Sequence, residues 1–178
     1  LKPRNGTGSE FIFLCRTEDQ CRKQYRRILQ GLELKKDHPM YGDLLAKQNR
    51  VTMESFLEGE EFSCDFLLEA ETVRILRVCK KWVSHDPHPG TARGYVLLTK
   101  EQAFMDLEIL SQTLLKGARA LGLTRALCMA DFILSGEGPT LLEMAPRPGG
   151  DCIPFLLRKA WNLDVLGLNL DFAAGERV

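Results

Sequence analysis

The sequence predicts a mixed α+β chain whose sheets are built from antiparallel strand pairs. Three β-like runs follow one another at residues 51–56, 61–68 and 72–82. A further pair of strands at 124–135 and 139–144 is joined by the tight turn Ser-Gly-Glu-Gly. Amphipathic helices are grouped before, between and after these strands. This arrangement favours antiparallel pairs over a repeated strand–helix–strand series.

The composition is that of an ordinary globular domain. The chain has 178 residues, of which 44% are hydrophobic and 27% charged, enough for one domain or two small lobes. Lys plus Arg equals Asp plus Glu at 24 each, so the net charge does not indicate a nucleic-acid-binding surface. No apolar run approaches the roughly 18 to 20 residues that span a bilayer. We therefore expect neither nucleic acid nor membrane among the partners.

The six cysteines are scattered and form no C-x-x-C pair. We expect them to be reduced and mostly buried thiols, as in a cytoplasmic protein, rather than disulfides or metal ligands. The segment SHDPHPGTARG (84–94) contains two histidines. Its prolines and glycines favour a surface loop over a zinc site.

Helices are predicted from capping signals and from the spacing of apolar residues. Thr17 and Gln20 form a capping box before an amphipathic run at 18–31. Thr99 and Gln102 form a second one, which predicts a helix reaching about Leu121. Two more helices are expected around 152–161 and 164–173. The polar stretch 35–50 is expected to be a connection.

The run 61–68 shows the period of a strand. Phe62, Cys64 and Phe66 alternate with Ser63 and Asp65. Alternation of this kind is typical of a strand with one face in the core and one face in solvent. We therefore expect a half-buried strand here.

Two segments have the composition of nucleotide-binding elements but allow simpler interpretations. The first, KPRNGTGS (2–9), has glycines that let backbone N–H groups cradle phosphate, but it also suits a plain hairpin turn. The second, MESFLEGEE (53–61), runs from a strand into an acidic turn. It suits either a solvated hairpin or an edge that hydrogen-bonds adenine.

The strongest candidate site is the predicted hairpin at 124–144. If its strands pair, Asp131 and Glu143 meet on one face, where two carboxylates repel unless a cation lies between them. Oxygen ligands of this kind, completed by phosphate, suit Mg²⁺. Arg147 follows in the segment PRPGG, and its planar guanidinium suits phosphate or carboxylate. The alternative is one exposed acid and one acid paired with Arg147.

The segment TLLEMAPRPGGDCIP (140–154) resembles the C-terminal signature of the ATP-grasp superfamily, a hydrophobic pair followed by Glu-x-Asn-x-Arg and glycines. The segments KPRNGTGS and MESFLEGEEFSCDFL resemble, in the family's order, its phosphate loop and its inter-lobe hinge. The resemblance implies two α+β lobes, residues 1–56 and 57–178, with antiparallel sheets enclosing a nucleotide cleft.

The resemblance also implies a role for each matching residue. The residues implied to contact the ATP phosphates are Lys2, Gly6, Gly8 and Ser9, and those implied to contact adenine are Glu54, Phe56, Leu57, Ile133 and Leu142. Glu61 is implied to contact the ribose. Asp131 and Glu143 are implied to bind the metal, and Arg147 the acyl phosphate. Lys2 and Arg147 are the candidate catalytic residues. Either Lys80 or Lys81 is expected to meet a phosphate. The implied cofactors are ATP and Mg²⁺, with Mn²⁺ as a substitute.

Two positions depart from the family pattern. The usual metal-binding Asn is Ala145, and the glycine that often ends the phosphate loop is replaced by Glu10 and Phe11. The implied function is an ATP-dependent ligase that activates a small carboxylic acid for attack by an amine, as in amino-acid and dipeptide ligases.

Three alternatives stay open: a nucleotide-binding module without catalysis, a ligase of nucleotide or cofactor biosynthesis, and a purely structural domain. The sequence starts at Leu1 without an initiator Met. We therefore expect an upstream domain of the same protein, and the fragment alone is not necessarily active.

Overall fold

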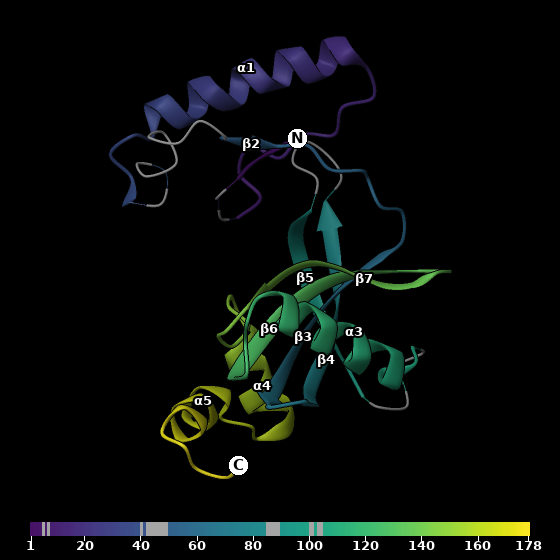
Figure 1. Cartoon of the computed structure of the whole chain (residues 1–178), viewed down its shortest axis with the longest axis vertical. Helices are drawn as coiled ribbons and strands as arrows, with labels where there is room; N and C mark the ends of the chain where they lie inside the picture. Colours follow the sequence, from purple (N-terminus) through teal and green to yellow (C-terminus); the bar gives the residue numbers. More distant parts are fainter. Residues whose placement is uncertain are drawn as a thin grey trace. The chain divides into compact units, whose positions relative to one another are not determined.

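The computed structural model describes residues 1–4, 6, 8–39, 41, 50–84, 90–99, 102 and 105–178 (Figure 1). The chain divides into two compact units. Unit 1 consists of Leu1–Leu57 and Val83–Arg93, and unit 2 of Glu58–Trp82 and Gly94–Val178. The sequence interpretation ended the first lobe at residue 56 and gave all later residues to the second. In the structure, Val83–Arg93 groups with unit 1 instead.

Unit 1 contains one long helix and a short two-stranded sheet. Helix α1 (Glu18–Leu34) begins as predicted, because the Thr17 hydroxyl accepts a hydrogen bond from the Gln20 N–H at 3.2 Å. It ends three residues later than predicted. Strand β1 (Lys2–Pro3) pairs antiparallel with β2 (Val51–Thr52). The strand predicted at 51–56 is thus only two residues long, since β1 offers two residues to pair with. Most of the predicted connection 35–50 lies outside the described residues.

The Glu10–Phe11 pair is fixed against α1 in unit 1. The Glu10 carboxylate accepts hydrogen bonds from Lys35 Nζ at 2.6 Å and from the Tyr41 hydroxyl at 2.8 Å, and these bonds lower the pKa of Glu10. Phe11 has a φ of 59° and packs against the small core of Phe13, Ile28, Leu32 and Tyr41. These two residues therefore anchor the end of the glycine-rich turn to the helix.

Gly31 gives a prediction about this anchor. A Cβ on Gly31 would lie 2.3 Å from Phe11 Cε1. We expect Gly31→Ala to destabilise unit 1 by about 1–3 kcal/mol through this overlap, although Gly→Ala inside a helix ordinarily stabilises it by roughly 1 kcal/mol. Hydrogen exchange of the α1 amides measures the change. In a Phe11→Gly background the same substitution should be stabilising. A stabilising effect with Phe11 present would contradict the contact.

Unit 2 is built on a five-stranded sheet with the order β5-β4-β3-β6-β7. The strands are β3 (Glu60–Glu69), β4 (Thr72–Ser84), β5 (Thr91–Leu98), β6 (Arg125–Ser135) and β7 (Gly138–Ala145). The last two residues of β4 and the first three of β5 group with unit 1. Strand β3 is antiparallel to both β4 and β6, and β6 is antiparallel to β7. The predicted hairpin is confirmed, with Gly136 and Glu137 as its turn.

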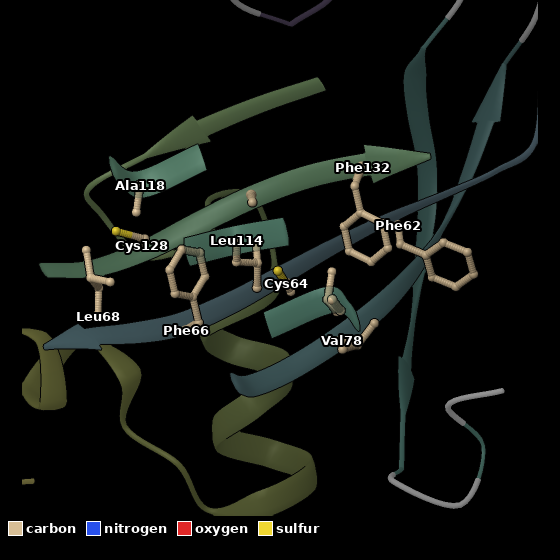
Figure 2. Close-up of a cluster of buried hydrophobic side chains, with 11 residues drawn as sticks. Phe62, Cys64, Phe66, Leu68, Val78, Leu114, Ala118, Cys128 and Phe132 are labelled. Atoms are coloured by element: carbon tan, nitrogen blue, oxygen red, sulfur yellow. The ribbon is translucent and has the colours of Figure 1, made fainter. Parts of the chain in front are cut away.

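Helix α3 (Leu107–Ala120) covers one face of this sheet. Its buried residues Leu110, Leu114 and Ala118 pack on alternate residues of the strands, and Figure 2 shows much of this cluster. The cluster consists of Phe62, Cys64, Phe66, Leu68, Val78, Cys128, Ala130 and Phe132 together with the three helix residues. The rings of Phe62 and Phe132 stack with their centroids 5.5 Å apart.

Helices α4 (Ile153–Trp161) and α5 (Val165–Ala173), both confirmed, cover part of the opposite face. Their buried residues pack on Leu67, Cys79 and Leu127, and in Figure 1 the two yellow helices lie near the end where β6 begins. The part of this face that the two helices leave uncovered carries Glu61, Lys81 and Asp131 together with the apolar Ile133.

Strand β3 is buried on both faces, so the prediction of a half-buried strand is wrong. Ser63 and Asp65 are 2% and 0% exposed. They occupy the central strand of the sheet, and the face that the alternation suggested would be solvated is covered there. The alternating pattern reflects polar partners inside the unit rather than water.

Two further predictions are corrected. Helix α3 begins at Leu107, not after Thr99, because Asp106 accepts hydrogen bonds from the N–H groups of Glu108 and Ile109. Its end near Leu121 is confirmed. Strand β5 was missed: its first four residues lie in the predicted loop 84–94. Residues 85–89 of that loop, including both histidines, lie outside the described part.

No helix among the described residues is long and apolar enough to cross a membrane. All six cysteines are free, and Cys64, Cys79 and Cys128 are buried. Burial raises the pKa of Cys64 to about 12.

Candidate functional site

The candidate site lies on the face of the unit 2 sheet opposite α3. Asp131 on β6 and Glu143 on β7 are direct partners in the antiparallel ladder. Phe132, the next residue, belongs to the core under α3, so alternation directs Asp131 to the other face. Residues directly opposite in such a pair share a face. The structure therefore brings the two predicted metal ligands to facing positions.

Lys81 on β4 links the carboxylates of this face. Its ammonium lies 2.5 Å from Glu61 Oε1 and 2.6 Å from Asp131 Oδ2, and its side chain is only 7% exposed. Burial alone would lower the pKa of Lys81, but the ion pairs with Asp131 and Glu61 more than offset this and raise it above the usual value. Lys81 therefore carries a positive charge that is held in place by Glu61 and Asp131.

The structure distinguishes between the two lysines that the sequence left open. Lys80 forms an ion pair with Glu60 at the surface, where its side chain is 33% exposed. Lys80 and Lys81 are adjacent in a strand, so their side chains point to opposite faces. Lys81 is the one that lies with Asp131, and it joins the candidate site.

Glu61 and Ile133 are also neighbours on this face, as direct partners in the β3–β6 ladder. Leu142 is different: the register shifts beside Asp131, so that Leu141 pairs with Phe132 and Leu142 has no partner on β6. Leu142 is 39% exposed. The predicted adenine floor thus consists of one strand residue and one bulge residue.

The charges of this face fit a divalent cation. Glu61, Asp131 and Glu143 supply three carboxylates against one ammonium from Lys81, which leaves two uncompensated negative charges. Glu143 forms no ion pair with any described residue, so its oxygens are available. Within the described chain, no three His, Cys, Asp or Glu side chains form a ready-made metal cluster. A cation bound here would be held by the two facing carboxylates of Asp131 and Glu143 and would complete its shell from water and phosphate.

Arg147 is exposed in the loop that follows β7. Its Nη1 donates to the Pro148 carbonyl at 2.9 Å, and its backbone N–H donates to the Ala145 carbonyl at 2.9 Å. Within the described residues it forms no ion pair, so the alternative of an acid paired with Arg147 has no support. The guanidinium remains available to an anion.

The sequence interpretation missed a buried polar group next to this site. The Arg77 guanidinium on β4 lies 2.9 Å from Asp65 Oδ1 on β3, and it also donates to the Ser63 hydroxyl. Asp65 Oδ1 accepts a second hydrogen bond, from the Gly149 N–H, at 2.9 Å. The pKa of Arg77 is raised, because the attraction of Asp65 outweighs the effect of burial. The signal available in the sequence was that Asp65 and Arg77 are charged residues within two apolar runs, which form the β3–β4 hairpin.

Unit 1 carries the other predicted nucleotide residues. Lys2 on β1 and Glu54, just after β2, form an ion pair of 2.9 Å with side chains 36% and 51% exposed. The pairing of β1 with β2 brings the predicted phosphate lysine next to the predicted adenine acceptor. Both remain accessible.

The glycine-rich turn is also in unit 1, as are residues 53–57 of the hinge segment, whereas its residues from Glu58 onwards belong to unit 2. Gly8 and Ser9 have positive φ values of 61° and 59°, and Gly6 is exposed. Thr7 lies outside the described residues. In the hinge, Phe56 is 56% exposed and Leu57 partly buried. The side chains of these segments are therefore not committed to the core.

Comparison with known proteins shows the family. The ATP-grasp domain family matches residues 1–155, and the chain belongs to this family. The structure is similar to the D-alanine–D-alanine ligase of Bacillus anthracis, with a TM-score of 0.63 and 13% identity over 98% of this chain and 53% of that one. The predicted ATP-grasp fold is thereby confirmed.

Similar sequences include two much longer proteins. The chain is 28% identical to carnosine synthase 1 of Mus musculus and 29% identical to carnosine synthase 1 of Homo sapiens, over 181 aligned residues each. The alignments cover 98% of this chain but 20% of each synthase. The chain thus spans about a fifth of the length of these relatives.

Proposed function

We propose that this chain is the Mg²⁺- and ATP-binding part of a cytoplasmic ligase that joins a small carboxylic acid to an amine. In this reaction the carboxylate attacks the γ-phosphorus of ATP and releases ADP. The amine then attacks the acyl phosphate and releases inorganic phosphate. The observation that carries the proposal is the facing pair Asp131 and Glu143 with Lys81 beside them.

The residues of unit 2 have distinct tasks in this proposal. Asp131 and Glu143 hold Mg²⁺, which when bound neutralises charge on the phosphate oxygens. Lys81 provides a further cation for the phosphates, and Glu61, its partner in an ion pair, accepts hydrogen bonds from the ribose hydroxyls. Arg147, free of ion pairs within the described residues, binds the transferred phosphoryl group. Most of the rate enhancement then comes from positioning and charge neutralisation.

The residues of unit 1 contribute nucleotide contacts. Lys2 and the turn containing Gly8 and Ser9 contact phosphates through an ammonium and backbone N–H groups. Glu54 and the backbone at Phe56 and Leu57 take the adenine edge. The exposure of these residues supports these roles.

The substrate class is inferred from the names of similar proteins. The name D-alanine–D-alanine ligase describes the joining of one amino acid to another, and carnosine synthase is named for the compound that it makes. We propose an amino acid or a similarly small acid as the acceptor of phosphate, and an amine as the second substrate.

One observation favours a second function, a nucleotide-binding module without catalysis. Ala145 stands where the family pattern has a metal-binding Asn, and its methyl side chain has no oxygen that could bind a metal. A module of this kind binds ATP but releases no ADP in the presence of acids and amines.

Calorimetry of ATP binding with and without Mg²⁺ tests the proposed function. We expect ATP to bind this chain in the presence of Mg²⁺ and at least tenfold more weakly in EDTA. Full-length protein with a panel of amino acids should then release ADP and phosphate. Mg²⁺-dependent ATP binding without ADP release would select the non-catalytic module. Absence of any ATP binding would overturn both.

A further inference from the structure

The buried group of Ser63, Asp65, Arg77 and Gly149 lies between the sheet and the loop that carries Arg147. Asp65 and Arg77 are direct partners in the β3–β4 ladder, and their side chains are 0% and 1% exposed. Asp65 Oδ1 accepts hydrogen bonds from both Arg77 and the Gly149 N–H. The pair is therefore shared between two strands and a loop.

This ion pair is a poor device for stability alone. Two buried charges lose their hydration, and replacing such a pair with apolar residues is often neutral or stabilising. Within the described chain, Asp65 Oδ2 and Arg77 Nε have no hydrogen-bond partner, so the loss of hydration is only partly offset. The presence of this ion pair is therefore better explained by the loop that it holds than by a gain in stability.

Gly149 shows how closely the loop is held. A Cβ at this position would lie 2.4 Å from Arg77 Nη2 and 3.1 Å from Asp65 Oδ1, so a side chain does not fit there. The next part of the loop has its own contact, since the Tyr95 hydroxyl donates to Asp151 Oδ2 at 2.8 Å. The loop is thus attached to the sheet at two points on the C-terminal side of Arg147.

The attachment reaches Arg147 through a short, stiff connection. Only Pro148 separates Arg147 from Gly149, and its ring fixes the φ angle. Pro146 restricts the other side. The Arg147 side chain is exposed, and its hydrogen bond within the described residues goes to the carbonyl of the neighbouring Pro148. Its location therefore depends on where Gly149 is held.

We propose that Asp65 and Arg77 are positioning residues: they fix Gly149, and through it place Arg147 for contact with the transferred phosphoryl group. This inference rests on the proposed function for the role of Arg147. Asp65 contacts no substrate and acts only through the loop.

The test uses a double substitution that removes the anchor without leaving a buried charge, Asp65→Leu with Arg77→Met. The probe is Mg–ADP with aluminium fluoride, which imitates a phosphoryl group in transfer. We expect the double substitution to weaken this complex about 10- to 100-fold and to leave binding of Mg–ADP alone within about twofold, because the carboxylates and Lys81 are unchanged.

A double-mutant cycle with Arg147→Ala separates positioning from general damage. If the anchor acts through Arg147, removing it in the Arg147→Ala background should change binding of the aluminium fluoride complex less than about threefold. Equal losses in both backgrounds, or full binding without the anchor, would overturn the proposal.

Hydrogen exchange of the Gly149 amide provides a readout that does not involve nucleotide. The double substitution should accelerate this exchange at least about tenfold, since the N–H loses its acceptor. If the unsubstituted chain binds no Mg–ADP, the proposed function fails and the role of Arg147 with it, and exchange still decides the anchor. Unchanged protection of Gly149 would show that Asp65 does not hold the loop.

Discussion

Glu143→Ala should abolish the Mg²⁺-dependent part of ATP binding. The side chain supplies one of two facing carboxylates, and it forms no ion pair with any described residue that would give it a structural task. Substituting residues that only support a metal ligand typically costs 10- to 100-fold in metal affinity, so loss of a ligand should cost at least about 100-fold. Calorimetric titration of ATP at several Mg²⁺ concentrations measures the loss.

The same hairpin offers a matched control. Glu137 is an exposed acid in the turn between β6 and β7, six residues from Glu143 along the chain. Glu137→Ala changes the net charge by the same amount and should leave ATP binding unchanged. Wild-type Mg²⁺ dependence in the Glu143→Ala variant would remove the metal assignment.

Arg77→Met should destabilise unit 2 by about 3–5 kcal/mol, because it leaves Asp65 charged and buried without its partner. Adding Asp65→Leu should restore most of this loss, since the uncompensated charge is then gone. Both tryptophans, Trp82 and Trp161, belong to unit 2, so their fluorescence during urea unfolding reports this unit.

A surface ion pair provides the comparison. Arg119 on α3 and Glu71, both in unit 2, are paired with side chains 56% and 67% exposed. Arg119→Met should change the stability of unit 2 by less than about 1 kcal/mol. If Arg77→Met costs no more than Arg119→Met, or if the second substitution at Asp65 adds to the loss, burial of the Asp65–Arg77 pair does not have the energetic consequence argued above.

The hairpin of β6 and β7 was predictable because its signals are local. Alternating residues, a Gly-rich turn and a short separation set the pairing of the two strands. The register shift beside Asp131, which these signals do not encode, then places Glu143 rather than Leu142 opposite Asp131. The ends of α4, α5 and α3 were also predictable to within about one residue.

The start of α3 was not predictable from local signals. Thr99 with Gln102 and Asp106 are both capable caps, and the Thr99 N–H does bond to the Gln102 side chain at 3.1 Å. The helix begins at Leu107, capped by Asp106, and places Leu110 and Leu114 in the core under the sheet. Such a choice depends on tertiary packing, which a capping motif does not encode.

The prediction that one face of β3 is in solvent was wrong for a similar reason. A polar residue at every second position predicts a solvated face only if nothing covers it. Here Ser63 and Asp65 meet Arg77 from the neighbouring strand and Gly149 from a loop 84 residues away in the chain. Likewise, only the sheet shows that Lys81, rather than Lys80, lies beside Asp131.

Crystals of the chain grown with Mn²⁺ and a non-hydrolysable ATP analogue test the central claim most directly. Anomalous scattering locates manganese without reference to the rest of the density. The metal should lie within about 2.5 Å of carboxylate oxygens of both Asp131 and Glu143 and contact phosphate oxygens of the nucleotide. Manganese bound elsewhere, or nucleotide bound with no metal between these two carboxylates, would contradict the proposed site.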